Sequence, residues 1–220
     1  MRLYLDTADP VDWEYLMPTG AFYGITTNPL LISQLGLNYG EIVWEEMVSK
    51  AADLGAKELH IQIYGDVNNA LSFGKHIYDL GRSLDIDCVI KIPFTLEGIL
   101  LSRKIKELGA KILMTACYEP KQMITACALK ADYVAPYFGR MMDEGLDAMA
   151  HMKVIEKIAR NSTCIPVIAS LRSVQQLLDI AEIGHNCFTI SPDVAKDLFS
   201  SKFTNAAAIA FETAIKGDKL

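Results

Sequence analysis

Eight short runs of apolar and β-branched residues are spaced along the whole chain, and longer amphipathic stretches lie between most of them. This alternation predicts parallel strands joined by helical crossovers. The expected strands lie at residues 3–6, 22–26, 58–64, 88–92, 111–115, 133–136, 166–170 and 187–190. The expected helices include residues 39–54, 68–82, 96–108, 121–129, 146–160 and 173–183. Asp9 followed by Pro10 also predicts the start of a short helix directly after the first strand.

Eight strand candidates favour closure into a (β/α)₈ (TIM) barrel over an open doubly wound sheet. The chain of 220 residues allows about 27 residues per unit, which is lean for this barrel but workable. The nucleotide-binding sequences GxGxxG and GxxxxGK[ST] of open sheets are absent. Since no linker or compositional break divides the chain, we expect one domain over residues 1–220. An additional C-terminal helix at about 204–216 carries an apolar stripe, which we expect to pack on its own barrel or on a neighbouring subunit.

The charge balance of 21 basic and 27 acidic residues gives a net charge of −6. This balance disfavours a nucleic-acid partner, because such binding rests on neutralising phosphates. The first residues lack the apolar run of a signal peptide, and no apolar stretch approaches the length of a membrane span. We therefore expect a soluble, cytoplasmic protein with no membrane partner.

The cysteines and histidines show no spacing that is typical of a metal site. The five cysteines are scattered without a CxxC pair, which favours reduced thiols packed as small apolar side chains. The four histidines form neither an HxH nor an HxxxH pattern, so we expect structural or surface roles for them. We expect no metal and no cofactor.

Polar residues gather at the carboxyl ends of the expected strands, where the functional groups of (β/α)₈ barrels lie. These candidates are Asp6, Thr26, Asn28, Gln62, Lys91, Thr115, Tyr137, Arg140, Ser170 and Arg172. Strand ends also meet water in any barrel, so each residue has a structural alternative.

Lys91 is the most informative of these positions. It lies within the apolar strand Cys88–Ile92, where alternation places it on the same face as Val89. Because barrel strands are buried on both faces, an ammonium group there is desolvated, and its pKa falls. A neutral amine can attack a carbonyl group and form a Schiff base. The alternative is a lysine that reaches the rim of the barrel and stays charged.

Arg140 and Arg172 lie just past two successive expected strands, and Ser170 ends the second of these strands. Together they suit a phosphate monoester, which guanidinium groups, hydroxyls and backbone N–H groups bind. Surface salt bridges are the alternative role of both arginines. Asp6 is a candidate general base, or alternatively a carboxylate that caps the turn at Asp9.

Gln62, Thr115 and Tyr137 are neutral and can hold a water molecule or a substrate hydroxyl. Taken singly, each is more often a polar group that is hydrogen-bonded within the core.

Several segments together resemble the transaldolase family. They are Leu5-Asp6-Thr7-Ala8, Gly24-Ile25-Thr26-Thr27-Asn28-Pro29, Ile90-Lys91-Ile92-Pro93, Ala135-Pro136-Tyr137-Phe138-Gly139-Arg140 and Ala169-Ser170-Leu171-Arg172. The resemblance covers nearly the whole chain in the same order. The short length resembles the small branch of the family, which contains fructose-6-phosphate aldolases and compact transaldolases.

This resemblance implies a (β/α)₈ barrel whose Schiff-base lysine, on the fourth strand, is Lys91. It implies that Asp6 and Asn28 contact the donor hydroxyls. It also implies phosphate contacts from Arg140, Ser170 and Arg172, and a catalytic water held by Gln62, Thr115 and Tyr137.

Two positions distinguish the branches of the family. Transaldolases typically carry Glu on the third strand and Phe in the sixth-strand motif, where the small aldolases carry Gln and Tyr. Gln62 and Tyr137 therefore resemble the aldolases, which cleave fructose 6-phosphate reversibly to dihydroxyacetone and glyceraldehyde 3-phosphate. The alternative is a transaldolase, which transfers the dihydroxyacetone unit between sugar phosphates (sedoheptulose 7-phosphate and glyceraldehyde 3-phosphate, erythrose 4-phosphate and fructose 6-phosphate). Met114 stands where a smaller residue is common, and we expect it to reshape the donor pocket.

The resemblance also implies a sugar-phosphate substrate and carbohydrate metabolism near the pentose phosphate pathway. It implies a homo-oligomer, which in the small branch is often a decamer of two pentameric rings with tail helices packed on neighbours.

Overall fold

A computed structural model describes residues 1–216 of the chain. Its parallel strands are β1 (Arg2–Asp6), β2 (Gly24–Thr26), β3 (Glu58–Gln62), β4 (Asp87–Pro93), β5 (Ile112–Cys117), β6 (Tyr133–Pro136), β7 (Ile165–Pro166), β8 (Ile168–Leu171) and β9 (Cys187–Ile190). They pair in the order β7-β6-β5-β4-β3-β2-β1-β9-β8. A bridge between Tyr137 and Ala169 joins the two ends of this sheet. Because β7 and β8 are two parts of one barrel strand, the sheet is an eight-stranded barrel, and the expected fold class is confirmed.

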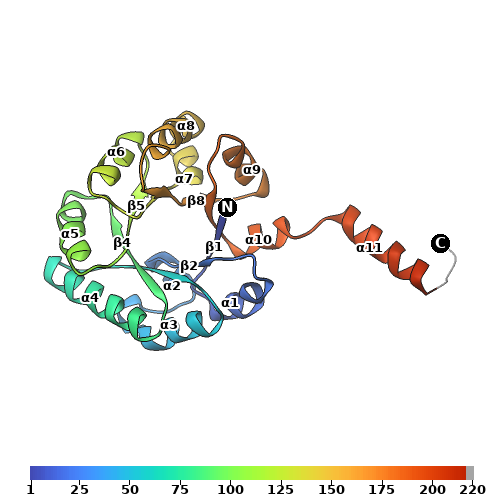
Figure 1. Cartoon of the computed structure of the whole chain (residues 1–220), viewed down its shortest axis with the longest axis horizontal. Helices are drawn as coiled ribbons and strands as arrows, with labels where there is room; N and C mark the ends of the chain where they lie inside the picture. The colour runs from blue at the N-terminus through green and yellow to red at the C-terminus, as the bar shows by residue number, and fades with distance from the viewer. Residues whose placement is uncertain (217–220) are drawn as a thin grey trace.

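Apart from the last helix of the chain, the helices surround the strands (Figure 1). They are α1 (Pro10–Leu16), α2 (Pro29–Gln34), α3 (Trp44–Asp53), α4 (Val67–Ser83), α5 (Leu96–Glu107), α6 (Pro120–Ala128), α7 (Phe138–Asp143), α8 (Ala148–Ala159), α9 (Val174–Glu182), α10 (Pro192–Leu198) and α11 (Lys202–Ile215), with 3₁₀ turns at Met17–Thr19 and Tyr39–Glu41. Five of the six longer expected helices are confirmed within a few residues. The sixth, expected at residues 39–54, is divided into a 3₁₀ turn followed by α3. The Asp9 carboxylate accepts a hydrogen bond from the Val11 N–H at 2.9 Å, so this residue caps α1 as expected.

Side chains alternate between two apolar layers along each strand. Leu59, Ile61 and Ile90 pack outward against the helices. Val89 and Leu113 point inward and join the second layer inside the barrel. Met114 belongs to the outward layer and is fully buried there. The expectation that Met114 reshapes the donor pocket is therefore wrong, because strand alternation turns it away from the barrel interior.

A polar cluster lies among the inward-facing residues near the amino ends of the strands. The fully buried Glu58 carboxylate accepts hydrogen bonds from Tyr4 Oη (2.7 Å), Tyr133 Oη (2.9 Å) and Lys111 Nζ (2.8 Å) and contacts His60 Nε2 (3.0 Å). Burial raises the pKa of Glu58, but the hydrogen bonds from its partners outweigh burial and lower it to about 2. Burial lowers the pKa of His60, so its imidazole stays neutral. This cluster closes the barrel at the end opposite to the candidate site.

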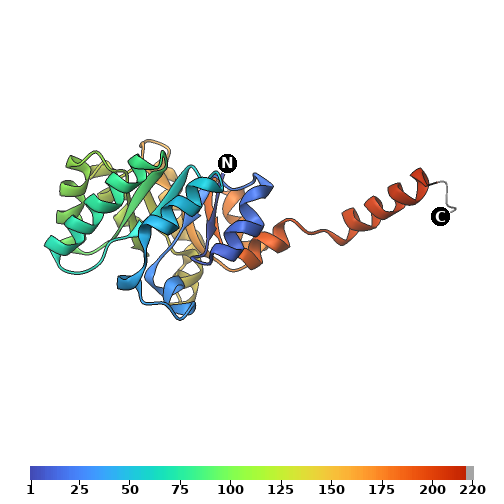
Figure 2. The ribbon, with the colours of Figure 1, turned by 90° about the horizontal axis from the view of Figure 1, so that it is seen from below.

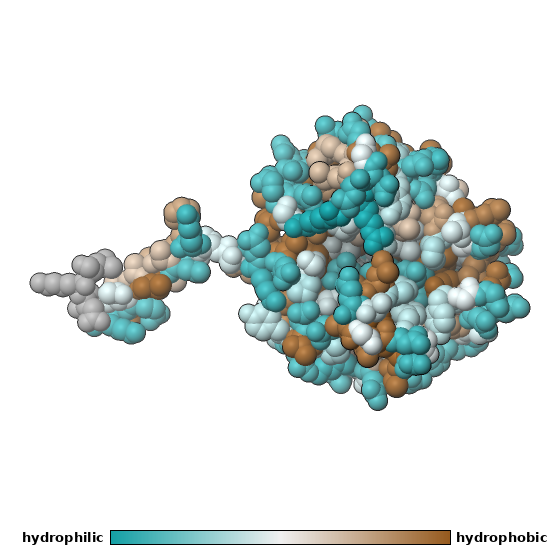
Figure 3. Space-filling view, turned by 180° about the vertical axis from the view of Figure 1, so that it is seen from behind, coloured by the Kyte–Doolittle hydropathy of each residue, from teal (hydrophilic) through white to brown (hydrophobic). Residues whose placement is uncertain are grey.

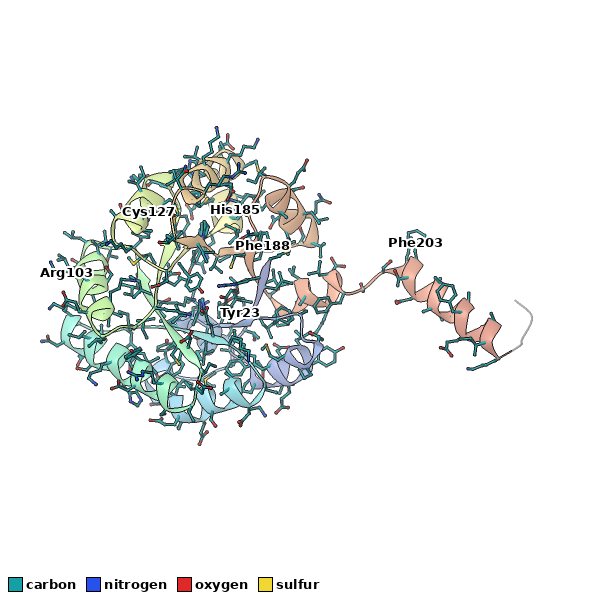
Figure 4. All side chains as sticks on the ribbon, viewed as in Figure 1. Tyr23, Arg103, Cys127, His185, Phe188 and Phe203 are labelled. Carbon is teal, nitrogen blue, oxygen red and sulfur yellow. The ribbon has the colours of Figure 1, made fainter. Side chains whose placement is uncertain are left out.

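Helix α11 stands away from the barrel in two perpendicular views (Figures 1 and 2) and in the space-filling view (Figure 3). None of its described residues is buried. Phe203, Ile209, Phe211 and Ile215 are 68–77% exposed, and Figure 4 shows Phe203 at the start of the helix, far from the barrel. The helix therefore does not pack on its own barrel. Residues 217–220 of the expected domain lie outside the described residues.

The remaining features are the cysteines, the possible metal ligands and the character of the helices. Cys88, Cys117, Cys164 and Cys187 are buried within the core, and Cys127 is half-buried. Within residues 1–216, His, Cys, Asp and Glu form no group of three or more that could hold a metal ion. Over the same residues, no helix combines the length and apolar character needed to cross a bilayer.

Candidate active site

Lys91 extends from β4 into the barrel and is 5% exposed. Its Nζ donates a hydrogen bond to the carbonyl oxygen of Thr27 at the end of β2. Burial removes water from the ammonium group and lowers its pKa to about 8, while the negative charge of Asp6 acts in the opposite direction. The side chain is therefore held inside the barrel, in contrast to the alternative of a lysine that reaches the rim.

Lys91 borders a cavity of about 160 Å³ at the carboxyl ends of the strands. The lining residues come from every barrel strand except β3 and from the segments that follow the strands: Asp6, Thr26, Asn28, Leu30, Leu31, Gln34, Lys91, Leu113, Ala135, Tyr137, Arg140, Val167, Ala169, Ser170 and Thr189. Seven of the ten residues predicted for the site are among them. The structure thus brings one basic amine, one carboxylate, one phenol and one guanidinium group to a single cavity.

The Asp6 carboxylate is oriented by a chain of hydroxyl groups. Thr26 Oγ1 donates to Asp6 Oδ1 at 2.7 Å and lies 2.5 Å from Thr189 Oγ1. Because Thr26 uses its proton toward Asp6, Thr189 must donate to Thr26. Strands β2 and β9 flank β1 on either side, so this chain fixes Asp6 from both neighbours.

Tyr137 and Thr115 form a second polar pair. Their hydroxyl oxygens lie 2.8 Å apart. Burial raises the pKa of Tyr137, and the hydrogen bond with Thr115 acts in the opposite direction. The phenol therefore carries its proton at neutral pH and can donate it within the cavity.

Asn28 and Arg140 lie at the mouth of the cavity. Asn28 Oδ1 caps α2 by accepting hydrogen bonds from the N–H groups of Leu30 (2.9 Å) and Leu31 (3.1 Å). The Cζ atom of Arg140 lies 5.1 Å from the centre of the Tyr137 ring, a stacking that holds the guanidinium group beside the cavity.

Irregular backbone accompanies two of the site strands. The register of β5 shifts between Met114 and Cys117, where Ala116 has a φ of 59°. The register between β8 and β9 shifts between Ile168 and Leu171, where Ser170 has a φ of 62°. Left-handed conformations of such residues cost of the order of 1–2 kcal/mol each. Both irregularities lie at or beside candidate site residues, as bulges near functional sites often do.

Three predicted residues do not line the cavity. Thr115 is linked to the cavity by its hydrogen bond with the hydroxyl group of Tyr137, which lines the cavity. Gln62 borders a different hollow, between α4 and α5, and its backbone carbonyl accepts a hydrogen bond from Tyr39 Oη at 2.5 Å. The Arg172 guanidinium is half-exposed and forms an ion pair with Asp143 at the end of α7.

Sequence reasoning missed several residues of the cavity wall. Thr189 lies at the carboxyl end of the eighth barrel strand, so the same rule that selected Asp6 could have found it. Leu113, Ala135, Val167 and Ala169 are apolar and face inward by alternation, but nothing in their residue type indicated a site.

A buried amine with a lowered pKa, beside a carboxylate and a protonated phenol at the carboxyl end of a (β/α)₈ barrel, defines an enzyme site of the Schiff-base aldolase type. The family model described as transaldolase/fructose-6-phosphate aldolase matches residues 3–219. The chain belongs to this family.

Relatives from several bacteria support the same family. A "Probable transaldolase" of Anaeromyxobacter dehalogenans (strain 2CP-C) is 28% identical over 214 residues, which cover 96% of this chain and 94% of the relative. A "Probable transaldolase" of Phenylobacterium zucineum (strain HLK1) is 30% identical and covers 93% and 91%. One of Aquifex aeolicus (strain VF5) is also 30% identical and covers 93% and 92%.

Among solved structures, a single-residue variant of mandelate oxidase aligns with a TM-score of 0.62 at 10% identity, over 88% of this chain and 66% of that one. A likeness at this identity shows a shared barrel fold and nothing of the chemistry.

Proposed function

We propose that this protein is a Schiff-base aldolase that reversibly cleaves fructose 6-phosphate to dihydroxyacetone and glyceraldehyde 3-phosphate. The observation that carries the proposal is Lys91, whose buried amine has a pKa of about 8 and borders the cavity together with Asp6 and Tyr137. At pH 7 an amine of this pKa is about 9% neutral, against about 0.03% at a pKa of 10.5, so burial supplies about 300-fold more nucleophile.

In this reaction the neutral Lys91 Nζ attacks the ketone carbon of the sugar, and loss of water gives a protonated imine. A base removes the proton of the C4 hydroxyl, and its electron pair forms the aldehyde carbonyl. The C3–C4 bond breaks, and its electrons move into the imine to give an enamine. Protonation of the enamine carbon and addition of water then release dihydroxyacetone and return the amine of Lys91.

Asp6 suits the role of the base, since the chain through Thr26 and Thr189 orients its carboxylate at the cavity. Tyr137 suits the role of the acid that protonates the enamine and orients the attacking water, with Thr115 fixing its hydroxyl. Arg140 and Ser170 at the mouth suit the phosphate group.

A second candidate function is transfer of the dihydroxyacetone unit to an acceptor such as erythrose 4-phosphate. The names of the relatives favour it, because all of those described above are "Probable transaldolase". The position of Tyr137 at the cavity favours the aldolase, because its hydroxyl supplies the proton that ends the enamine. Gln62 pairs in register with Lys91 across β3 and β4 but is not among the residues that line the cavity, so it supports the aldolase less directly than Tyr137 does.

The two candidates differ in their need for an acceptor. Glyceraldehyde 3-phosphate released from fructose 6-phosphate is measured with and without erythrose 4-phosphate. Release without an acceptor, with an equal amount of dihydroxyacetone, is the expected result. Release only in the presence of the acceptor makes the protein a transaldolase.

We also propose that α11 packs on another copy of the chain in a cytoplasmic homo-oligomer. The support is the exposure of Phe203, Ile209, Phe211 and Ile215 on a helix with no buried residue. Light scattering coupled to gel filtration tests this. A double substitution of Phe203 and Phe211 by Asp is expected to lower the oligomeric mass, and an unchanged mass contradicts the proposal.

A further inference from the structure

An ion pair joins the two segments that carry the candidate phosphate ligands. Arg172, which follows β8, places Nη1 2.8 Å from Oδ1 of Asp143 and bonds Oδ2 through Nη2. Asp143 is the last residue of α7, the helix that also carries Arg140. The hydrogen bond from Arg172 lowers the pKa of Asp143, and the charges of Arg172 and Arg140 act in the same direction. Asp143 therefore lies within the electrostatic reach of both arginines.

The pair uses only one edge of the guanidinium group. Arginine carries five N–H donors in a planar fork, so the edge that contains Nε can bind a second anion while the outer edge stays bonded to a carboxylate. In Arg172 the outer edge faces Asp143, and Nε lies on the side of Gly139. The orientation of Nε is thus set by the contact with Asp143.

Arg172 Nε and Ser170 Oγ lie near each other beside Gly139, whose backbone packs against the Ser170 carbonyl group. A Cβ atom built on Gly139 would lie 3.1 Å from Arg172 Nε and 3.1 Å from Ser170 Oγ. The two donors are therefore no more than about 6.2 Å apart. Because separate oxygens of one phosphate group can each accept a charge-assisted hydrogen bond of about 2.7–2.9 Å, two donors within this distance can bond the same phosphate. A side chain at Gly139 would collide with the Ser170 carbonyl oxygen, 2.1 Å from the Cβ position, so glycine permits this close packing. Ser170 lines the cavity that holds Lys91.

We propose that Asp143 is a positioning residue for phosphate binding: it holds the outer edge of Arg172 so that the Nε edge faces the phosphate of the substrate beside Ser170. This inference rests on the proposed function for its substrate. The negative charge of Asp143 repels a bound anion. Because Asp143 and Arg172 are both about half-exposed, water and salt screen this repulsion. The directional hydrogen bonds between Arg172 and Asp143 are weakened less.

The test compares a phosphorylated with an unphosphorylated aldehyde in the addition of dihydroxyacetone. Substitution Asp143→Ala is expected to raise the KM of glyceraldehyde 3-phosphate about three- to tenfold, the loss expected for one weakened charge-assisted contact. The KM of glyceraldehyde and both kcat values stay within about twofold. Glu144→Ala removes the neighbouring exposed carboxylate and serves as the matched control, with no change expected.

A double-mutant cycle separates positioning from a general charge effect. Arg172→Met alone is expected to raise the KM of glyceraldehyde 3-phosphate at least as much as Asp143→Ala, and adding Asp143→Ala to it has no further effect. A lower KM in Asp143→Ala, equal changes for both aldehydes, or a full effect of Asp143→Ala in the Arg172→Met background overturns the proposal.

Binding of inorganic phosphate, measured by titration calorimetry, keeps this test independent of turnover. Wild-type protein that binds phosphate more tightly than Asp143→Ala supports the positioning role even if fructose 6-phosphate is not cleaved, in which case only the proposed function fails. Wild-type protein that binds no phosphate, or binds it as Asp143→Ala does, overturns the positioning role.

Discussion

Replacement of Lys91 by Met tests whether the barrel interior desolvates the amine. In the unfolded chain the ammonium keeps its proton up to a pKa of 10.5, whereas in the folded protein the pKa is about 8. At about 1.4 kcal/mol per pKa unit, this shift lowers the free energy of unfolding by about 3 kcal/mol below pH 8, relative to a chain without this group. Between pH 8 and 10.5 the unfolded state binds more protons, so the wild-type free energy of unfolding rises with pH.

Met has a similar shape and no charge, so Lys91→Met does not carry this cost. The variant also loses the hydrogen bond to the Thr27 carbonyl, worth about 1 kcal/mol at every pH. We therefore expect it to be about 2 kcal/mol more stable than the wild type at pH 6.5, and this advantage to shrink by about 2 kcal/mol at pH 9.5.

The assay is urea unfolding of both proteins at pH 6.5 and 9.5, at equal protein concentration. Lys57→Met, at an exposed lysine, is the matched control and is expected to show no pH-dependent difference. A stability difference between Lys91→Met and the wild type that is the same at both pH values refutes the reasoning, because the ammonium would then be as well solvated as in the unfolded chain.

Three further variants test other parts of the structure. Glu58→Gln weakens the buried cluster with Lys111 and is expected to cost about 3 kcal/mol in urea unfolding at pH 7; a cost below about 1 kcal/mol contradicts the account of that cluster. Gly139→Ala places a Cβ 2.1 Å from the Ser170 carbonyl oxygen and is expected to raise the KM of phosphorylated aldehydes more than that of unphosphorylated ones, which steady-state kinetics with both substrates checks. Tyr137→Phe removes the proposed acid and is expected to lower acceptor-free release of glyceraldehyde 3-phosphate about 100-fold, while transfer to erythrose 4-phosphate falls less. Equal losses in both assays would argue against that role.

The barrel and much of the site follow from the sequence because both depend on local patterns. The alternation of apolar runs with amphipathic stretches fixes the strands and the longer helices. The barrel geometry then places Asp6, Lys91 and Ser170 at one end, since each stands at or near the carboxyl end of a strand. The same alternation also places Met114 outside the barrel interior, so the expectation that it shapes the pocket overlooked the period of two along a strand.

The contact made by Arg172 depends on structure that the sequence does not reveal. Asp143 lies 29 residues before Arg172, and it meets the guanidinium only because α7 forms after β6. A helix of six residues is too short for a clear helical period. The polar cluster around Glu58 could not be predicted from the sequence either. Its members come from β1, β3, β6 and the residue before β5, and they share no sequence motif.

The position of α11 is also beyond local patterns. Its apolar stripe predicts that something covers the helix, but the partner of a helix is not encoded in its own period. The structure excludes the chain's own barrel for residues 202–215.

The most direct test of the central claim is to locate the covalent intermediate. The protein is incubated with fructose 6-phosphate, the imine is reduced with borohydride, and the modified peptide is identified by mass spectrometry. The account predicts one adduct, on Lys91, and none in Lys91→Met. An adduct on another lysine, or an adduct that persists in Lys91→Met, would contradict the assignment of Lys91 as the nucleophile.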